Sequence, residues 1–232
     1  SAASDVYKRQ AGTQAASFQS QMQNVGTLLD GDVQGKLQGM SKQLKQVSID
    51  TGAATSDLTD GLYQVVSAFG ESAESVKQLE IAAKAAKAGN ATTTDSVNML
   101  SAVTKGYGDT SAAALQKASD LAFLTVKLGQ TSFPELASSM GQVVPLAATM
   151  KVSQEELFGA MATLTGVTGG TAEVTTQLRA TMQEFLSPSS QMEKALKKMG
   201  YTSGAAALES EGLGGILTKL KESVKGDEVA FA

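Results

Sequence analysis

The side chains that most often carry enzymatic chemistry are scarce in this chain of 232 residues. It contains no His and no Cys, so the commonest general base, the commonest zinc ligand and the thiol nucleophile are missing. The most concentrated acidic pairs are Asp57 with Asp60 and Glu155 with Glu156. Each pair falls where a helix is expected to begin, and acidic groups there stabilise the helix dipole. We therefore predict no catalytic residues and no enzyme.

Three further patterns resemble binding sites, and each has a simpler structural interpretation. Residues 166–171 are rich in Gly and Thr but lack the Gly-Lys-Ser/Thr ending of a phosphate loop, and no strand precedes them, so we expect a turn between helices. Residues 212–215 fail as a phosphate loop for the same reasons. The cluster of Lys194, Lys197 and Lys198 is expected to face the negative end of a helix dipole rather than an anion. No cofactor or metal site is predicted.

Methionines in the second half of the chain could form an adaptable binding surface, but Met is also the ordinary filler of irregular helical cores. We favour the core for all of them. They are Met140, Met150, Met161, Met182, Met192 and Met199.

The composition favours packed helices. Hydrophobic residues make up 42% of the chain and aromatic residues only 5%, without Trp, so the core must be built from Ala, Leu, Val and Met. The net charge is -4 with Lys and Arg scattered, which argues against nucleic-acid binding. No stretch approaches the roughly 18 apolar residues of a membrane span.

Helical periodicity runs along most of the sequence. Residues 11–50 carry a thin apolar stripe, broken near Asp30-Gly31-Asp32, that favours an extended or two-stranded helix over a globular core. Beyond it, capping-box sequences at 132–135 and 153–156 mark helix starts, and six glycines fall where a left-handed C-terminal cap is expected. They are Gly70, Gly89, Gly108, Gly129, Gly169 and Gly200. These helices are expected at 56–69, 73–88, 94–107, 112–128, 134–150, 154–167, 172–186, 190–199 and 213–224.

A weak internal repeat underlies these helices. Residues 57–70 align with 95–108 at an offset of 38, and the same acidic start with apolar groups at i, i+4 and i+7 recurs from Glu135 and from Glu156. Ala-rich helices between the first units would let backbones pack closely. We predict an all-α fold of stacked helical hairpins, or an irregular multi-helix bundle, with an extended N-terminal helix.

Both ends of the sequence look cut. The chain starts without Met, and residues 1–10 resemble the translation of a sequencing adapter, so they are excluded from reasoning about the fold. The other end stops in apolar sequence. The expected organisation is therefore an adapter-derived stretch at 1–10, a Gln-rich amphipathic segment at 11–50, a helical conserved domain at 51–226 and a truncated end at 227–232.

The central block is similar to a known family. The residues that carry the likeness form an ordered series from residue 51 onward. They are residues 61–70, 82–89, 106–108, 133–137, 141–147, 155–157, 160–165, 168–171, 177–179 and 186–188. This series resembles the N-terminal conserved region of phage tail tape measure proteins, the phage-related minor tail protein family.

The resemblance implies a structural protein of the virion tail, assembled in the bacterial host cytoplasm, that occupies the lumen of the growing tail tube and sets its length. It implies tail-tube and tail-assembly chaperone proteins as partners, together with self-association, and neither nucleic acid nor membrane for this segment. A helix advances about 1.5 Å per residue, so chain length can become tube length. The short, interrupted helices of 51–226 instead suggest a folded docking module, with the ruler elsewhere.

Two other functional classes stay open. The repeat is compatible with an α-helical adaptor that binds another protein's helix, and Ala- and Gly-rich helices also suit a helical toxin or secretion substrate.

Overall fold

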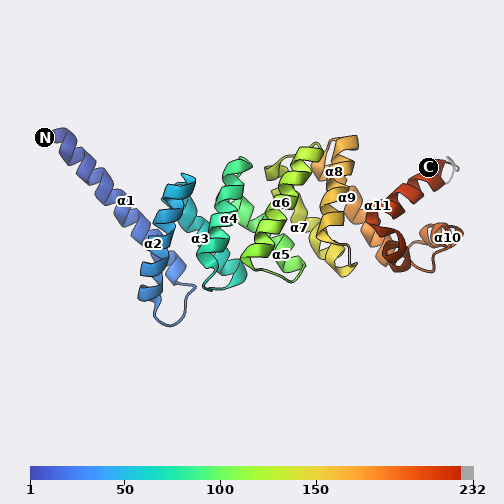
Figure 1. The fold of residues 1–232 in the computed structure, drawn as a ribbon, viewed down its shortest axis with the longest axis horizontal. Helices are drawn as coiled ribbons and strands as arrows, with labels where there is room; N and C mark the ends of the chain where they lie inside the picture. Colours follow the sequence, from blue (N-terminus) through green and yellow to red (C-terminus); the bar gives the residue numbers. More distant parts are fainter. Residues whose placement is uncertain (226–232) are drawn as a thin grey trace. The chain divides into compact units, whose positions relative to one another are not determined.

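The computed structural model describes residues 1–225, and all regular structure in that range is helical (Figure 1). The described helices are α1 (Ala2–Gly26), α2 (Val33–Thr51), α3 (Thr55–Phe69), α4 (Ser75–Ala88), α5 (Thr93–Gly106), α6 (Ala112–Leu128), α7 (Phe133–Thr149), α8 (Gln154–Thr168), α9 (Thr171–Leu186), α10 (Ser190–Lys198) and α11 (Gly204–Lys225). The all-α prediction is confirmed. The truncated end expected at 227–232 lies outside the described residues.

Most helix boundaries follow the local signals in the sequence. Ser153 and Glu156 form a complete capping box at the start of α8, because each side chain hydrogen-bonds the other residue's backbone N–H. Gly169 ends that helix in the left-handed conformation, with φ of 80°. The expected left-handed caps at Gly89 and Gly129 are wrong. Gly89 has φ of -92° and Asn90 adopts the positive φ instead, and the φ of Gly129 is not positive.

The helices fall into two compact units. The first comprises residues 1–104 and 109–119, and the second comprises 105–108 and the residues from 120 onward.

In the first unit, α1 and α2 run antiparallel around a turn at Gly31. Asp32 starts α2 by accepting a hydrogen bond from the Gly35 N–H. The thin stripe of apolar residues becomes the buried face of this pair, which packs on α3 and α4. Its buried members include Met22, Val25, Leu37, Met40, Leu44 and Val47.

Successive hairpins of the first unit are joined by hydrogen bonds between side chains and their neighbours. The Thr93 hydroxyl at the start of α5 donates to Asp57 Oδ2 at the start of α3, at 2.7 Å. The Gln78 amide of α4 donates to the Thr110 carbonyl just before α6, also at 2.7 Å. These contacts connect helices 32 to 36 residues apart in sequence, which is the spacing expected for stacked hairpins.

The second unit repeats this pattern. Helix α7 packs along α9, and α8 and α9 both contact α11. The hydroxyls of Thr131 and Thr171, which precede and begin α7 and α9, lie 2.8 Å apart. The Phe123 and Phe133 rings stack with their centroids 5.0 Å apart, which anchors the start of α7 beside α6.

Candidate interaction surfaces

One member of each acidic pair that could have suggested catalysis has a structural role. Asp57 accepts the Thr93 hydroxyl, so it fixes the start of α5 against α3. Glu156 accepts the Ser153 N–H at 3.1 Å and caps α8. Asp60 lies exposed on α3. Within residues 1–225, no group of three or more acidic side chains is placed to hold a metal ion.

The glycine-rich segments are helix breaks. Residues 166–171 form the turn from α8 to α9, as expected, with Gly170 at the start of α9. Residues 212–215 lie inside α11, where Gly212 has φ of 67° and ψ of 171° and interrupts the helix. The break lets Leu213 and Ile216 become fully buried.

The methionines divide into two groups. Met140, Met161 and Met182 have no exposed surface and belong to the core. The core assignment is wrong for Met150, Met192 and Met199, which are partly exposed, and Met150 lines a pocket.

The basic cluster lies on α10, where Lys197 and Lys198 occupy the last helical turn.

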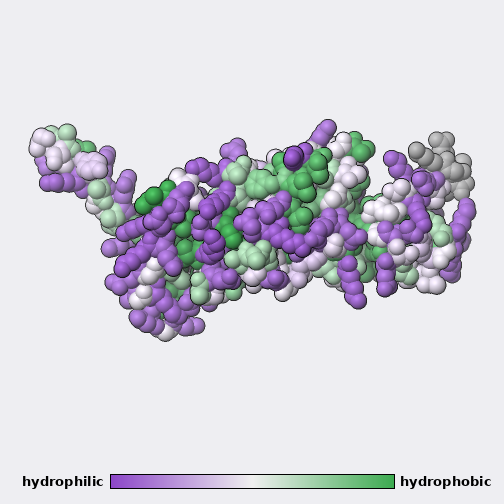
Figure 2. Space-filling model, viewed as in Figure 1, coloured by the Kyte–Doolittle hydropathy of each residue, from purple (hydrophilic) through white to green (hydrophobic). Residues whose placement is uncertain are grey.

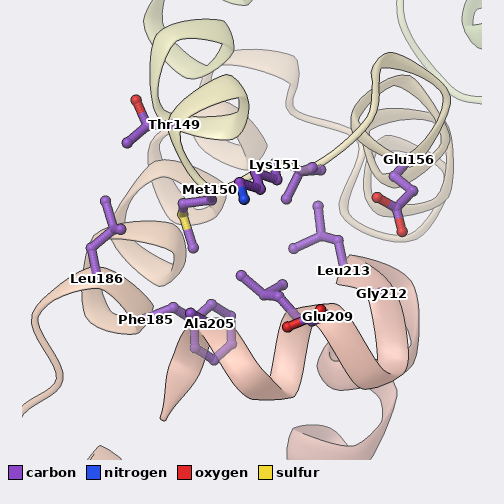
Figure 3. Close-up of a pocket in the computed structure, with 12 residues that line it drawn as sticks. Thr149, Met150, Lys151, Glu156, Phe185, Leu186, Ala205, Glu209, Gly212 and Leu213 are labelled. Carbon is purple, nitrogen blue, oxygen red and sulfur yellow. The ribbon is translucent and has the colours of Figure 1, made fainter.

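That pocket, of about 520 Å³, is the first candidate surface and belongs to the second unit (Figure 3). The ends of α7 and α9, the start of α8 and the first half of α11 enclose it. Figure 3 shows Met150, Phe185 and Leu213 around the same space, with Glu209 from α11 nearby. The pocket was not predicted from the sequence, because the last helix was expected to begin at 213 rather than at Gly204. The run Ala205-Ala206-Ala207-Leu208 is nevertheless strongly helix-forming.

A tyrosine holds the turn that forms one wall of this pocket. The Tyr107 hydroxyl donates to the Val152 carbonyl at 2.8 Å. Burial, together with the nearby carboxylates of Glu156 and Glu155, raises the pKa of Tyr107 above its usual value. Tyr107 is therefore a neutral hydrogen-bond donor, and its role is to position the turn between α7 and α8.

The second candidate surface is a groove between α1 and α2, with a volume of about 1040 Å³. Phe18, Met22 and Leu37 give it an apolar floor. Lys42 and Lys45 lie along α2, and no acidic residue lines the groove. The Lys45 ammonium lies 5.5 Å from the centre of the Phe18 ring.

The third candidate surface, named the uncharged face after its α8 part, consists of the outer side of α8 and the exposed leucines at the end of α6. The last turn of α6 also carries the exposed Lys127. No residue from 157 to 172 is charged. Its exposed members are Leu124, Leu128, Gly159, Thr163, Gly166 and Val167. Val167 is 75% exposed and Leu128 is 66% exposed. Figure 2 shows hydrophobic side chains gathered over α6 and toward α8.

The ends of α6 and α8 lie in direct contact within this face. The Gln130 N–H, just after α6, donates to the Thr165 hydroxyl at 3.3 Å. A Cβ atom on Gly129 would lie 2.9 Å from the Ala162 carbonyl oxygen, so only glycine fits this approach.

Within residues 1–225, no helix is both long and apolar enough to cross a membrane. No curated protein and no solved structure matches the chain. The family model for phage-related minor tail proteins, in contrast, matches residues 41–230, a span that contains every helix from α3 to α11. The chain therefore belongs to the phage-related minor tail protein family.

Proposed function

We propose that this chain is the folded docking module of a tape measure, the protein that sets tail length while a phage tail assembles. Membership of the minor tail family supports a structural role among other tail proteins. The proposal adds a division of labour, in which this region attaches to tail proteins and other parts of the full-length protein measure length.

The observation that carries this proposal is the folding back of the helices. A ruler must convert residues into length, and an extended helix does so at about 1.5 Å per residue. Here α3 packs on α4, and α7 packs along α9. Because these helices fold back on one another, residues added to a hairpin do not extend the fold by 1.5 Å each. This region is therefore poorly suited to measuring tail length.

The uncharged face supports the attachment role. Protein interfaces are depleted in charged residues at their centre, and exposed apolar side chains are costly to leave together in water. Leu128 and Val167 lie at the C-terminal ends of α6 and α8. After Glu156, α8 carries no charged residue, and Lys127 is the exposed charge in the last turn of α6. We assign this face to contact with a tail protein such as a tail-tube subunit.

A deletion in the parent phage tests the division of labour. Removing residues 133–168, which span α7 and α8, should abolish tail assembly because the second unit loses its core. If the region were part of the ruler, the same deletion would give intact tails shorter by roughly 50 Å, at 1.5 Å per residue. Electron microscopy of lysates distinguishes the two results, and shortened tails would refute the proposal.

A second candidate is a helical adaptor that binds a helix of some other protein. The serial hydrogen bonds between hairpins, such as Thr93 to Asp57, favour this because stacked hairpins commonly form binding surfaces. Co-purification from infected cells discriminates: recovery of tail-tube and tail-assembly chaperone proteins supports the tail role, and recovery of unrelated proteins alone supports the adaptor.

A further inference from the structure

We propose that the groove between α1 and α2 binds an acidic amphipathic helix of a partner protein. Most of this groove precedes residue 41, where the family match begins, so the proposal depends on the geometry of the groove rather than on the family.

The spacing of residues along α1 suits a helical ligand. Ala11, Ala15, Phe18 and Met22 all line the groove and follow one another at intervals of four, three and four residues. This is the spacing of a coiled-coil seam, in which side chains of one helix enter holes on another. The stripe runs over about 17 Å at 1.5 Å per residue, which matches three turns of a docked helix.

Helix α2 provides the opposite wall. Leu37 is buried at 4% exposure and extends the apolar floor, and Gln34 and Gln38 line the groove with uncharged polar groups. The antiparallel pair α1 and α2 therefore presents two sides of a three-helix arrangement. A third helix with one apolar face would complete it, as in other helix-in-groove complexes.

Charge identifies the chemistry of that third helix. Lys42 and Lys45 are both exposed, and every other lining residue is uncharged. The neighbouring Lys36 differs, because it is paired with Glu71 at 2.9 Å. Two lysines beside an apolar floor without an acidic neighbour are complementary to carboxylates that flank an apolar stripe.

A second copy of α1 fits the groove poorly. Residues 11–26 of α1 contain no charged residue, so a second copy of this helix brings no carboxylate to Lys42 and Lys45. A helix with carboxylates beside its apolar stripe gains electrostatic complementarity that a second copy of α1 lacks.

Two synthetic helices provide the test. The acidic peptide has 21 residues, with Leu and Ala at alternating four- and three-residue intervals and Glu at the flanking positions; the basic peptide replaces each Glu with Lys. Fluorescence anisotropy with the full chain at low ionic strength should show the acidic peptide binding at least about tenfold more tightly, and added salt should narrow this difference.

Reversing the charges of the two groove lysines should reverse the preference for the acidic peptide over the basic peptide. The double variant Lys42→Glu, Lys45→Glu is expected to weaken acidic-peptide binding at least about tenfold and to strengthen basic-peptide binding. The matched control, Lys105→Glu with Lys127→Glu, reverses two exposed lysines elsewhere and should change neither affinity. Ala15→Glu, at an exposed position that lines the groove, should block the acidic peptide while leaving the melting curve unchanged.

Three results would overturn the proposal. The first is equal binding of the two peptides. The second is acidic-peptide binding that persists in both groove variants while their circular dichroism melts match that of the parent chain. The third is self-association, detected by light scattering, that Ala15→Glu abolishes, since this would show that another copy of the chain fills the groove.

Discussion

Helices α4 and α8 are each built around small apolar residues, yet they present opposite surfaces to solvent. On α4, Glu80 accepts hydrogen bonds from Lys84 at 2.7 Å and from Lys77 at 3.5 Å, so the outer face carries its own ion pairs. On α8, no charged residue follows Glu156. The same helical architecture thus provides one surface suited to water and one suited to contact.

The charges on α4 contribute little to holding the fold together. Exposed ion pairs are typically worth about 0 to 1 kcal/mol, because solvent screens them and ordering long side chains costs entropy. Their main effect is to keep that face hydrated. The outer face of α8 has no such charges after Glu156, so α4 and α8 should respond differently to the same kinds of substitution.

The largest difference is expected in tail assembly. Thr163→Lys with Val167→Lys places two cations in the uncharged face, and burying an unpaired charge in an interface costs several kcal/mol. We expect at least about a tenfold drop in tails counted by electron microscopy. The melting temperature of the isolated chain should barely change, since both residues are exposed.

Removing charge from α4 is the matched control for that experiment. Lys77→Ala with Lys84→Ala should leave tail numbers near those of the parent phage. Normal tail numbers with the Thr163→Lys, Val167→Lys variant would show instead that the uncharged face stays exposed to solvent and contacts no other tail protein.

The next difference concerns how closely each of the two helices packs against its neighbour. A Cβ on Gly129 would meet backbone atoms of Ala162, which cannot move aside, whereas a Cβ on Gly61 would meet side-chain methyl groups of Leu79 and Thr93. We expect Gly129→Ala to cost about 1 to 3 kcal/mol of unfolding free energy. Gly61→Ala should be milder, because alanine gains up to about 1 kcal/mol of helix propensity within α3.

Urea unfolding of the two glycine variants measures this contrast directly. Equal destabilisation by the two substitutions would mean that the contact of Gly129 with α8 is no tighter than the contact of Gly61 with α4.

The smallest effect is electrostatic and belongs to α4 alone. The hydrogen bond from Lys84 lowers the pKa of Glu80 below its usual value near 4.5. A lowered carboxyl pKa adds stability above the unfolded-state pKa, and this stability is lost as pH falls through the folded-state pKa. Glu80→Gln should therefore cost about 0.3 to 0.5 kcal/mol at pH 7.

The pH dependence of urea unfolding checks the origin of that cost. The difference between the Glu80→Gln variant and the parent chain should shrink to nothing once the pH is well below 4.5. A difference that persists in acid would indicate lost packing rather than a lost charge.

Periodicity and capping residues were sufficient to predict most of the helices. Starts and ends agree within two residues from α3 to α10, because caps such as Ser153 act locally. The first half of α11 was missed, since its apolar run is short and lies between Gly204 and Gly212. A helix with two glycine-marked ends gives little periodic signal.

The candidate surfaces were less predictable for a different reason. Helix α6 is apolar on most sides, so periodicity does not reveal that Leu124 and Leu128 face solvent while Leu115 is buried. The groove likewise depends on the register between α1 and α2, which pairs Phe18 with Lys45. Such information arises only when distant segments are placed together.

The break at Gly212 links two elements that are far apart in the sequence. Any side chain at this position would approach Glu156 Oε1 to 2.6 Å, and the same carboxylate caps α8. A substitution at 212 would thus disturb the beginning of α8 and the path of α11 in one event. We expect evolutionary change at either position to be constrained by the other, so that glycine at 212 and the acidic cap at 156 are inherited together.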